Sequence, residues 1–99
     1  MAKFLYLYTG GNPPADAAEG QKVMQAWMAY FGRMGSRIVD GGAPLGARQS
    51  VAGAPASAAS GYSLIEAGDL AEAVKLTDGH PHLASGGAIE VLETNPIPM

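Results

Sequence analysis

The chain has 99 residues, of which 47% are hydrophobic and 15% are charged, and its formal net charge is −3. This length predicts a single domain over residues 1–99, and this apolar content excludes a disordered chain. Six Lys and Arg residues in all cannot form a basic surface, so we expect no nucleic-acid partner. The absence of cysteine excludes disulfides, thiolate metal ligands and cysteine nucleophiles.

The apolar run near the N-terminus is too short for a signal peptide or a membrane span. It covers residues 4–8 and stops at Thr9-Gly10-Gly11. The longest uncharged stretch, residues 49–65, is rich in Ala, Ser, Gly and Pro and is only weakly apolar. We therefore expect no membrane partner and a cytoplasmic location.

The first two predicted elements are a buried strand and an amphipathic helix. Residues 4–8 are apolar on both faces, which favours a strand. Residues 15–34 have apolar side chains at helical spacing, which predicts a helix. The stripe consists of Val23, Trp27, Tyr30, Phe31 and Met34, widened by Met24 and Met28. We interpret this stripe, Trp27 included, as core contact and not as a ligand-binding surface.

The middle of the chain is predicted to be a short strand followed by a long connection. Residues 37–40 favour a strand that ends at a Gly-Gly pair. Residues 43–60 are rich in Ala, Gly, Ser and Pro, and within them residues 48–51 can pair with 56–59 as a local hairpin. A pocket lid and a flexible loop are the alternatives for this segment.

The last third of the chain contains a strand, a helix and a strand. Residues 62–67 form a strand between glycines. The spacing of Asp69 and Glu72 resembles a capping box and starts a helix, which Gly79 and Pro81 end. Residues 88–93 alternate as a final strand, and an extended tail follows.

This order of elements, βαββαβ, predicts an α+β ferredoxin-like fold: an antiparallel sheet with both helices on one face. Alternation in the first strand places Leu5 and Leu7 on one face and Phe4, Tyr6 and Tyr8 on the other. Because the helices cover one face, the other needs a partner, and we expect a homodimer. Two sheets packed face to face would bury the second set and enclose a cavity lined by tyrosine hydroxyls.

Short motifs along nearly the whole chain resemble those of the YCII-related proteins, which include members named for a DGPF motif. The motifs are GGAPL (41–45), GYSLIEA (61–67) with DL (69–70), HPHL (80–83), GGAIEV (86–91) and PIPM (96–99). The resemblance implies a dimeric α+β barrel of ferredoxin-like protomers. This architecture is also used by small isomerases, monooxygenases and dismutase-like enzymes.

Some members of this family resemble enzymes through a His and Asp pair that faces a cavity, with the His in the first helix. This chain has no His in residues 15–34, and the position that we align is near Met24. The literal Asp-Gly-Pro-Phe motif is also absent. His80 stands before Pro81, where the family often has Cys.

His80 and His82 are the two histidines of the chain, and imidazole is the side chain best suited to move a proton near neutrality. Residues two apart in extended backbone point the same way, so both rings can face one cavity. Three interpretations remain open: polar rings in a turn after the helix, proton transfer by His82, or metal ligation. A metal would need further ligands such as Asp40 or Glu66.

Asp40 and the strand tyrosines complete the candidate site. A carboxylate at a strand end, as at Asp40, can orient an imidazole or accept hydrogen bonds from turn amides. Tyr6, Tyr8 and Tyr62 can present a hydroxyl to a ligand or pack as core. Ser63 lies on the opposite side of its strand from Tyr62, so only one of the two can face a cavity.

These observations lead to two hypotheses. The first is a homodimer that binds a small organic molecule in a sheet-lined pocket, with His82 as proton shuttle, Asp40 as its orienting partner, and Tyr6, Tyr62 and His80 as ligand-binding residues. The second is a non-catalytic dimerisation or accessory module. We expect no cofactor and no metal in either case, because no dinucleotide loop, phosphate loop or nucleophile elbow is present.

Overall fold

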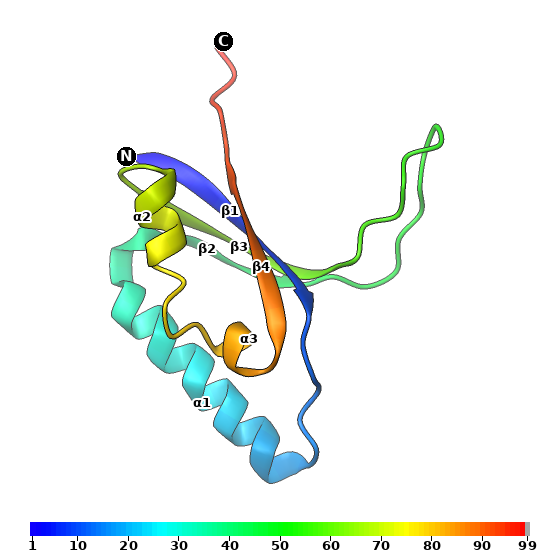
Figure 1. Ribbon diagram of the computed structural model, residues 1–99, viewed down its shortest axis with the longest axis vertical. Coiled ribbons are helices and arrows are strands. Elements are labelled where there is room, and N and C mark those ends of the chain that lie inside the picture. The colour runs from blue at the N-terminus through cyan, green and yellow to red at the C-terminus, as the bar shows by residue number, and fades with distance from the viewer. Residues whose placement is uncertain (99) are drawn as a thin grey trace.

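The structure, a computed structural model, describes residues 1–98. Its elements in chain order are β1 (Ala2–Gly10), α1 (Ala17–Met34), the 3-10 turn η1 (Gly35–Arg37), β2 (Ile38–Pro44), β3 (Ala59–Ala67), α2 (Leu70–Lys75), α3 (Pro81–Ala84) and β4 (Gly87–Glu93) (Figure 1). All four predicted strands and both predicted helices are present. In the part of the chain described, none of the helices is long and apolar enough to cross a membrane.

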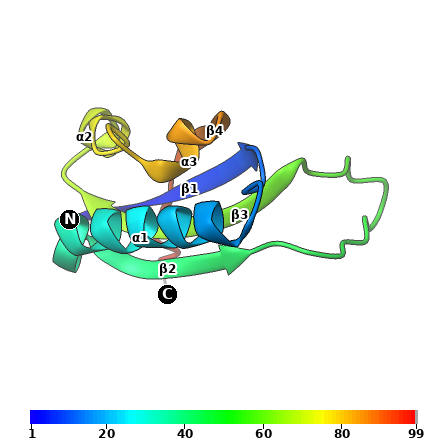
Figure 2. The ribbon, with the colours of Figure 1, turned by 90° about the horizontal axis from the view of Figure 1, so that it is seen from below.

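The four strands form one sheet in the order β2-β3-β1-β4, and every neighbouring pair is antiparallel. The helices lie on the same side of this sheet, and the strands twist across the molecule (Figures 1 and 2). The protein is therefore an α+β protein with a four-stranded antiparallel sheet, an arrangement compatible with the ferredoxin-like fold expected from the order of its elements.

The helix-facing side of the sheet is the core. Phe4, Tyr6 and Tyr8 of β1 are buried there, and Tyr30 and Met34 of α1 pack against them. Two tyrosine hydroxyls secure α2 to this core. Tyr6 Oη donates a hydrogen bond to the carbonyl of Ala73, and Tyr30 Oη donates one of 2.8 Å to the carbonyl of Leu76. These bonds pair buried phenols with carbonyls near the end of a short helix.

The open side of the sheet carries the leucines. Leu5 pairs with Leu64 on one side and with Leu92 on the other, and Leu7 pairs with Tyr62. Four of these side chains are half-buried, and Leu92 is 37% exposed. The prediction that tyrosine hydroxyls line a cavity on the uncovered face is therefore wrong for Tyr6 and Tyr8. The helices cover the aromatic set, and the hydroxyl of Tyr6 reaches the backbone of α2.

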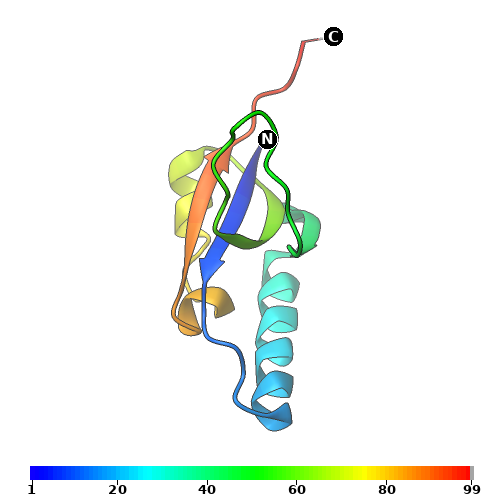
Figure 3. The same ribbon diagram turned by 90° about the vertical axis from the view of Figure 1, so that its right-hand side faces the viewer.

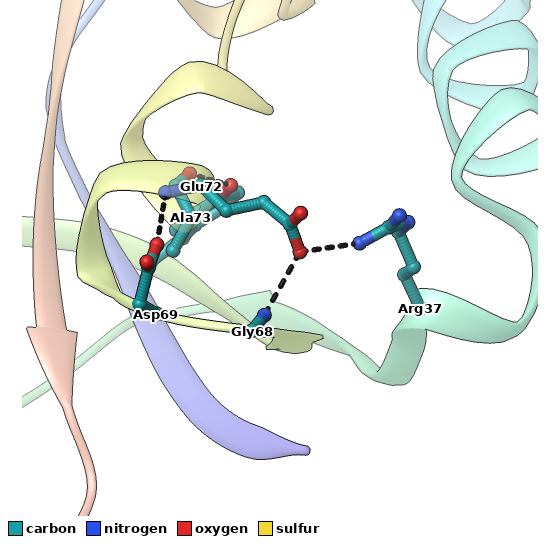
Figure 4. Close-up of polar contacts among 6 residues, drawn as sticks. Arg37, Gly68, Asp69, Glu72 and Ala73 are labelled. Carbon is teal, nitrogen blue, oxygen red and sulfur yellow. Dashed lines mark hydrogen bonds and ion pairs between the residues drawn. The ribbon is translucent and has the colours of Figure 1, made fainter.

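The first turn of α2 confirms the predicted capping box. Asp69 accepts a hydrogen bond of 2.8 Å from the amide of Glu72. The Glu72 carboxylate reaches back to the amide of Gly68 at 2.8 Å and also accepts a bond of 2.9 Å from Arg37 (Figure 4). The Gly68 amide, followed by Arg37, lowers the pKa of Glu72. Both charges are partly exposed, so the ion pair adds little to stability and the cap is the main role.

The apolar stripe of α1 is narrower than predicted. Tyr30 and Met34 are buried, but Met24 is 64% exposed and Met28 is 67% exposed. α1 lies along β2 at one edge of the sheet, so part of this helix has no strand beneath it (Figures 1 and 2). The two methionines therefore do not belong to the core.

The turn after α2 contains a short helix that the sequence did not predict. Pro81 occupies the first helical position of α3, where its missing N–H costs nothing, and His80 is the N-cap residue. Histidine is not a usual N-cap residue, which is why this start signal was missed. The helix fixes the backbone between the two histidines.

Residues 45–58 form an arm that projects from the sheet between β2 and β3 (Figures 1 and 3). The predicted hairpin between residues 48–51 and 56–59 is wrong, because no strand is assigned within the arm and Ala59 pairs with Thr9 of β1. Its bonds are irregular: Arg48 donates to the carbonyl of Ser57 at 2.7 Å. Small side chains and Pro55 provide neither cross-strand packing nor a complete ladder of donors.

The last residues described continue beyond β4. Both the amide and the hydroxyl of Thr94 donate to the carbonyl of Lys3, at 3.0 and 2.9 Å. The extended tail predicted after the last strand is present up to Pro98, and Met99 lies outside the described residues.

Candidate functional site

A cavity of about 340 Å³ opens between α1 and the end of the sheet where β1 finishes. Its side-chain walls are Tyr8, Trp27, Phe31 and His82, and the rest of its boundary is formed by residues 41–44 of β2 and 60–62 of β3. Cavities of this size, mostly apolar with a few polar groups, are typical of small-molecule sites.

Three aromatic rings form one wall of the cavity. The ring centroids of Tyr8 and Trp27 are 5.5 Å apart with an interplanar angle of 82°, and those of Trp27 and Phe31 are 5.6 Å apart at 62°. These are edge-to-face contacts, which hold the rings in fixed orientations. Trp27 is half-buried and packs against the core, as its spacing predicts, and it also borders the cavity.

Glycines leave three positions of the opposite wall without a side chain. A Cβ atom at Gly41 would lie 3.7 Å from Cε2 of Phe31, and one at Gly61 would lie 3.4 Å from Cδ2 of Tyr8. Gly42 has a φ of 80°, and a Cβ there would overlap the carbonyl oxygen of Tyr62. Any larger residue at Gly41 or Gly61 would therefore occupy the space next to the aromatic wall.

His80 lies behind the wall and orders a chain of hydrogen bonds. It is 1% exposed, and its Nδ1 accepts a bond of 3.0 Å from the amide of His82. Nε2 therefore carries the proton and donates to Tyr8 Oη at 3.1 Å. Tyr8 in turn donates to Ser63 Oγ at 2.7 Å, and Ser63 donates to the carbonyl of Gly41 at 2.8 Å.

This chain fixes the protonation of its members. Burial lowers the pKa of His80 to about 4, with smaller effects from the nearby His82 and Arg33. Burial also raises the pKa of Tyr8 to about 12. Both groups are therefore neutral at pH 7, and each hydrogen bond in this series has a fixed donor and a fixed acceptor. The expected ligand-binding role of His80 does not fit this placement, because the ring is enclosed and does not border the cavity.

His82 borders the cavity and has a different partner. Its Nε2 donates a bond of 2.8 Å to the carbonyl of Thr9, and its ring centroid is 5.1 Å from that of Tyr8. A Cβ atom at Gly87 would lie 2.1 Å from this Nε2, and one at Gly11 would lie 3.0 Å from Cε1. The ring thus sits between two glycines. Its other nitrogen, Nδ1, has no hydrogen-bond partner within residues 1–98. Because no unpartnered side-chain nitrogen is buried there, Nδ1 is accessible to solvent.

The structure does not join Asp40 to His82. The Asp40 carboxylate is exposed and accepts a bond of 2.8 Å from the amide of Gly42, which is the turn-stabilising alternative. Asp40 pairs with Leu64, a residue of the open face of the sheet. No hydrogen bond or ion pair links it to an imidazole in the described chain. The group that orients His82 is the carbonyl of Thr9, in place of the predicted Asp40.

The two tyrosines predicted to bind a ligand lie in different places. Tyr6 is completely buried and its hydroxyl is occupied by Ala73, so it does not border the cavity. Tyr62 borders it, but alternation along β3 directs its ring away from Ser63, toward the open face. The predicted opposition of Tyr62 and Ser63 is confirmed: Tyr62 is the one of the two that borders the cavity, and Ser63 is buried on the core side of β3.

Sequence reasoning missed the wall residues Tyr8, Trp27 and Phe31 as a group, and it missed the Thr9 carbonyl. The signal that could have pointed to the contact of His82 with Thr9 is the presence of Gly-Gly pairs at 10–11 and 86–87. Glycines there leave room for a ring to approach two backbones, and that ring is His82.

Within residues 1–98, no group of three or more His, Asp or Glu side chains is arranged to hold a metal ion. Comparison with known proteins gives no assignment either: no family model matches the chain, and no curated protein matches it.

Proposed function

We propose that this protein binds a small organic molecule in the cavity between the sheet and α1. The observation that carries the proposal is an open cavity of about 340 Å³ walled by three mutually packed aromatic rings and one histidine. Glycines on the facing strands leave part of the space unfilled by side chains. The hydrogen bond from the buried His80 holds Tyr8 in place. A surface that served only to complete the core would be filled.

His82 is the residue that we propose to contact the ligand through hydrogen bonding. The Thr9 carbonyl holds the proton on Nε2, which leaves a lone pair on Nδ1. A histidine oriented in this way is suited to accept a hydrogen bond or a proton from a bound molecule. His82 keeps the proton-shuttle role expected for it, and Thr9 takes over the orienting role from Asp40.

We also propose that the protein is a homodimer assembled through the open face of the sheet, as in the dimeric α+β barrels of YCII-related proteins. Support comes from the half-buried or exposed apolar side chains that meet across β1, β3 and β4. They are Leu5, Leu7, Tyr62, Leu64 and Leu92. The same observation favours the alternative function, a dimerisation module without catalysis, since the four leucines of this face do not line the cavity.

Native mass spectrometry tests the dimer. We expect a dimer for the unmodified protein and a monomer for Leu7→Lys, because a charge at the centre of the apolar face would lose its hydration in the interface. Met28→Lys, a change at an exposed apolar residue of α1, is the matched control and should remain dimeric. A monomeric wild-type protein, or a Leu7→Lys dimer of full strength, would overturn this assembly.

A fragment screen tests ligand binding. Trp27 is the only tryptophan of the chain, so its indole N–H gives a single side-chain resonance that reports on the cavity. Compounds that bind should shift this resonance in the wild-type protein and in Gly46→Ala, where an added Cβ meets nothing within 4 Å. They should fail to shift it in Gly41→Ala, because the new methyl group points at Phe31. Equal shifts in both variants, or none in the wild type, would contradict the proposal.

A further inference from the structure

The charge of the cavity walls restricts what can bind there. None of the wall residues within the described chain is Lys, Arg, Asp or Glu, and the one titratable side chain whose ring nitrogen is open to solvent is His82. A carboxylate or phosphate placed here would lose water without gaining a cation. The site therefore favours an uncharged ligand.

The shape of the cavity restricts the ligand further. At Gly41 the space between the β2 backbone and Phe31 accommodates about one methyl group, since a Cβ there would be in ordinary contact at 3.7 Å. The facing wall consists of aromatic rings in edge-to-face contact. A flat ring does not fit into this gap, but it fits beside the gap in the cavity, where its faces and edges can pack against Trp27 and Phe31.

The polar atoms of the site favour a hydrogen-bond donor. The hydroxyl of Tyr8 already accepts from His80 and donates to Ser63, and the hydroxyl of Ser60 donates to the carbonyl of Tyr8 at 3.2 Å. The Nδ1 of His82, a residue of the cavity wall, is an acceptor without a partner in the described residues, and the missing side chain of Gly11 leaves the space next to it open. A ligand hydroxyl that donates to this nitrogen would satisfy it.

We propose that the ligand of this cavity is an uncharged planar ring compound that carries a hydroxyl group, as in phenols and naphthols, and that its hydroxyl donates to His82 Nδ1. This inference rests on the proposed function, because it specifies the chemical class that the same cavity selects. It makes His82 the residue that distinguishes hydroxylated rings from plain hydrocarbons, and it makes Trp27 and Phe31 the residues that hold the ring.

Isothermal titration calorimetry with three ligands of one ring system tests the class. The probes are 2-naphthol, naphthalene and 2-naphthoate, at a pH where only the last is charged. A net hydrogen bond contributes about 0.5–1.5 kcal/mol, so 2-naphthol should bind roughly 2- to 10-fold more tightly than naphthalene. 2-Naphthoate should bind more weakly than both. Equal or tighter binding of 2-naphthoate would overturn the proposal.

Variants of His82 assign the difference to its nitrogen. His82→Phe keeps a flat ring of similar size and should bind naphthalene as before, while the preference for 2-naphthol disappears. His82→Gln keeps both a donor for the Thr9 carbonyl and an acceptor, and should retain part of the preference. The Trp27 indole resonance shows whether each variant keeps its fold. A preference that survives in a folded His82→Phe protein would contradict the assignment.

The outcomes separate this inference from the proposed function. Binding of naphthalene and 2-naphthol with equal affinity would leave a ligand cavity in place but refute the hydroxylated class. Binding of none of the three would refute the cavity as an aromatic ligand site. Aromatic walls also attract cations, so tetramethylammonium is included, and its binding in the absence of 2-naphthol binding would overturn the proposed class in favour of a cationic ligand.

Discussion

His80 and Tyr8 are joined by a hydrogen bond of 3.1 Å in which the buried imidazole donates to the phenol, although 72 positions separate them in the chain. The direction of this bond follows from the other nitrogen of His80, which accepts the amide of His82. The contact ties the N-cap of α3 to the wall of the cavity. His80, which was expected to bind a ligand, instead donates from a buried position to Tyr8.

Loss of His80 should therefore destabilise the protein. His80→Ala removes an N-cap acceptor, leaves Tyr8 without its donor and creates a cavity, which together should lower the free energy of unfolding by about 2–4 kcal/mol. Urea unfolding followed by circular dichroism measures this. Gly46→Ala in the arm is the control and should change stability by less than about 0.5 kcal/mol. A His80→Ala protein as stable as the control would refute the structural role.

The same residue predicts a pH dependence of stability. The pKa of His80 is about 4 in the folded protein, against 6.5 for an unperturbed histidine, so the unfolded chain binds this proton first as the pH falls. Stability contributed by neutral His80 is fully present above pH 6.5 and is lost as the pH falls toward 4. The loss is on the order of 3 kcal/mol.

Unfolding in urea at pH 7 and at pH 4.5 measures this loss, and His80→Asn is the matched variant, since Asn is a good N-cap but does not titrate. The decrease in stability between the two pH values should be smaller in His80→Asn than in the wild type. Identical decreases would show that carboxylates, and not His80, account for the acid sensitivity.

Gly87 should be intolerant of any side chain. A Cβ at this position would lie 2.1 Å from Nε2 of His82, so Gly87→Ala must displace the ring from the Thr9 carbonyl. We expect a loss of about 1–3 kcal/mol and weaker ligand binding. Gly32→Ala on α1, where nothing lies within 4 Å of the new atom, is the control and should stabilise the helix by about 0.5–1 kcal/mol. A stable, ligand-binding Gly87→Ala protein would contradict the position of His82.

The carboxyl group of Glu72 should titrate below the usual range for glutamate. The amide of Gly68 is the larger cause and Arg37 the smaller one, so Arg37→Gln should leave most of the shift in place. Because the folded pKa is lowered, this group stabilises the fold above its unfolded pKa, and the contribution is lost as the pH falls. NMR titration of the side-chain carboxyl carbon measures the pKa. A normal value in Arg37→Gln would show that the ion pair dominates.

Much of the fold could be predicted because its signals are local. Asp69 and Glu72 lie three positions apart and identify the start of α2 from side-chain chemistry alone, and the alternation of β1 separates leucines from aromatic residues. What local pattern could not decide is which of these two sets the helices cover. Both sets are apolar, so burial of either one is favourable.

The site depended on contacts that spacing does not reveal. His82 meets the carbonyl of Thr9, 73 positions earlier, and a backbone oxygen carries no residue-type signal. Asp40 was predicted to orient His82 because a carboxylate is the usual partner of an imidazole, but the irregular pairing of β2 with β3 directs Asp40 to its own turn. Trp27 packs against the core as its spacing predicts, but spacing does not reveal that the same ring also borders the cavity.

We propose that the cavity between the sheet and α1 holds a flat, uncharged ring packed beside Trp27. Titration of the labelled protein with 2-naphthol, followed through the single indole N–H resonance of Trp27, is the direct test. We expect a saturable shift of this resonance in the wild type and in Gly46→Ala, and no saturable shift in Gly41→Ala. An indole resonance that does not move in the wild type, or that moves equally in Gly41→Ala, would contradict the assignment of this cavity as the ligand site.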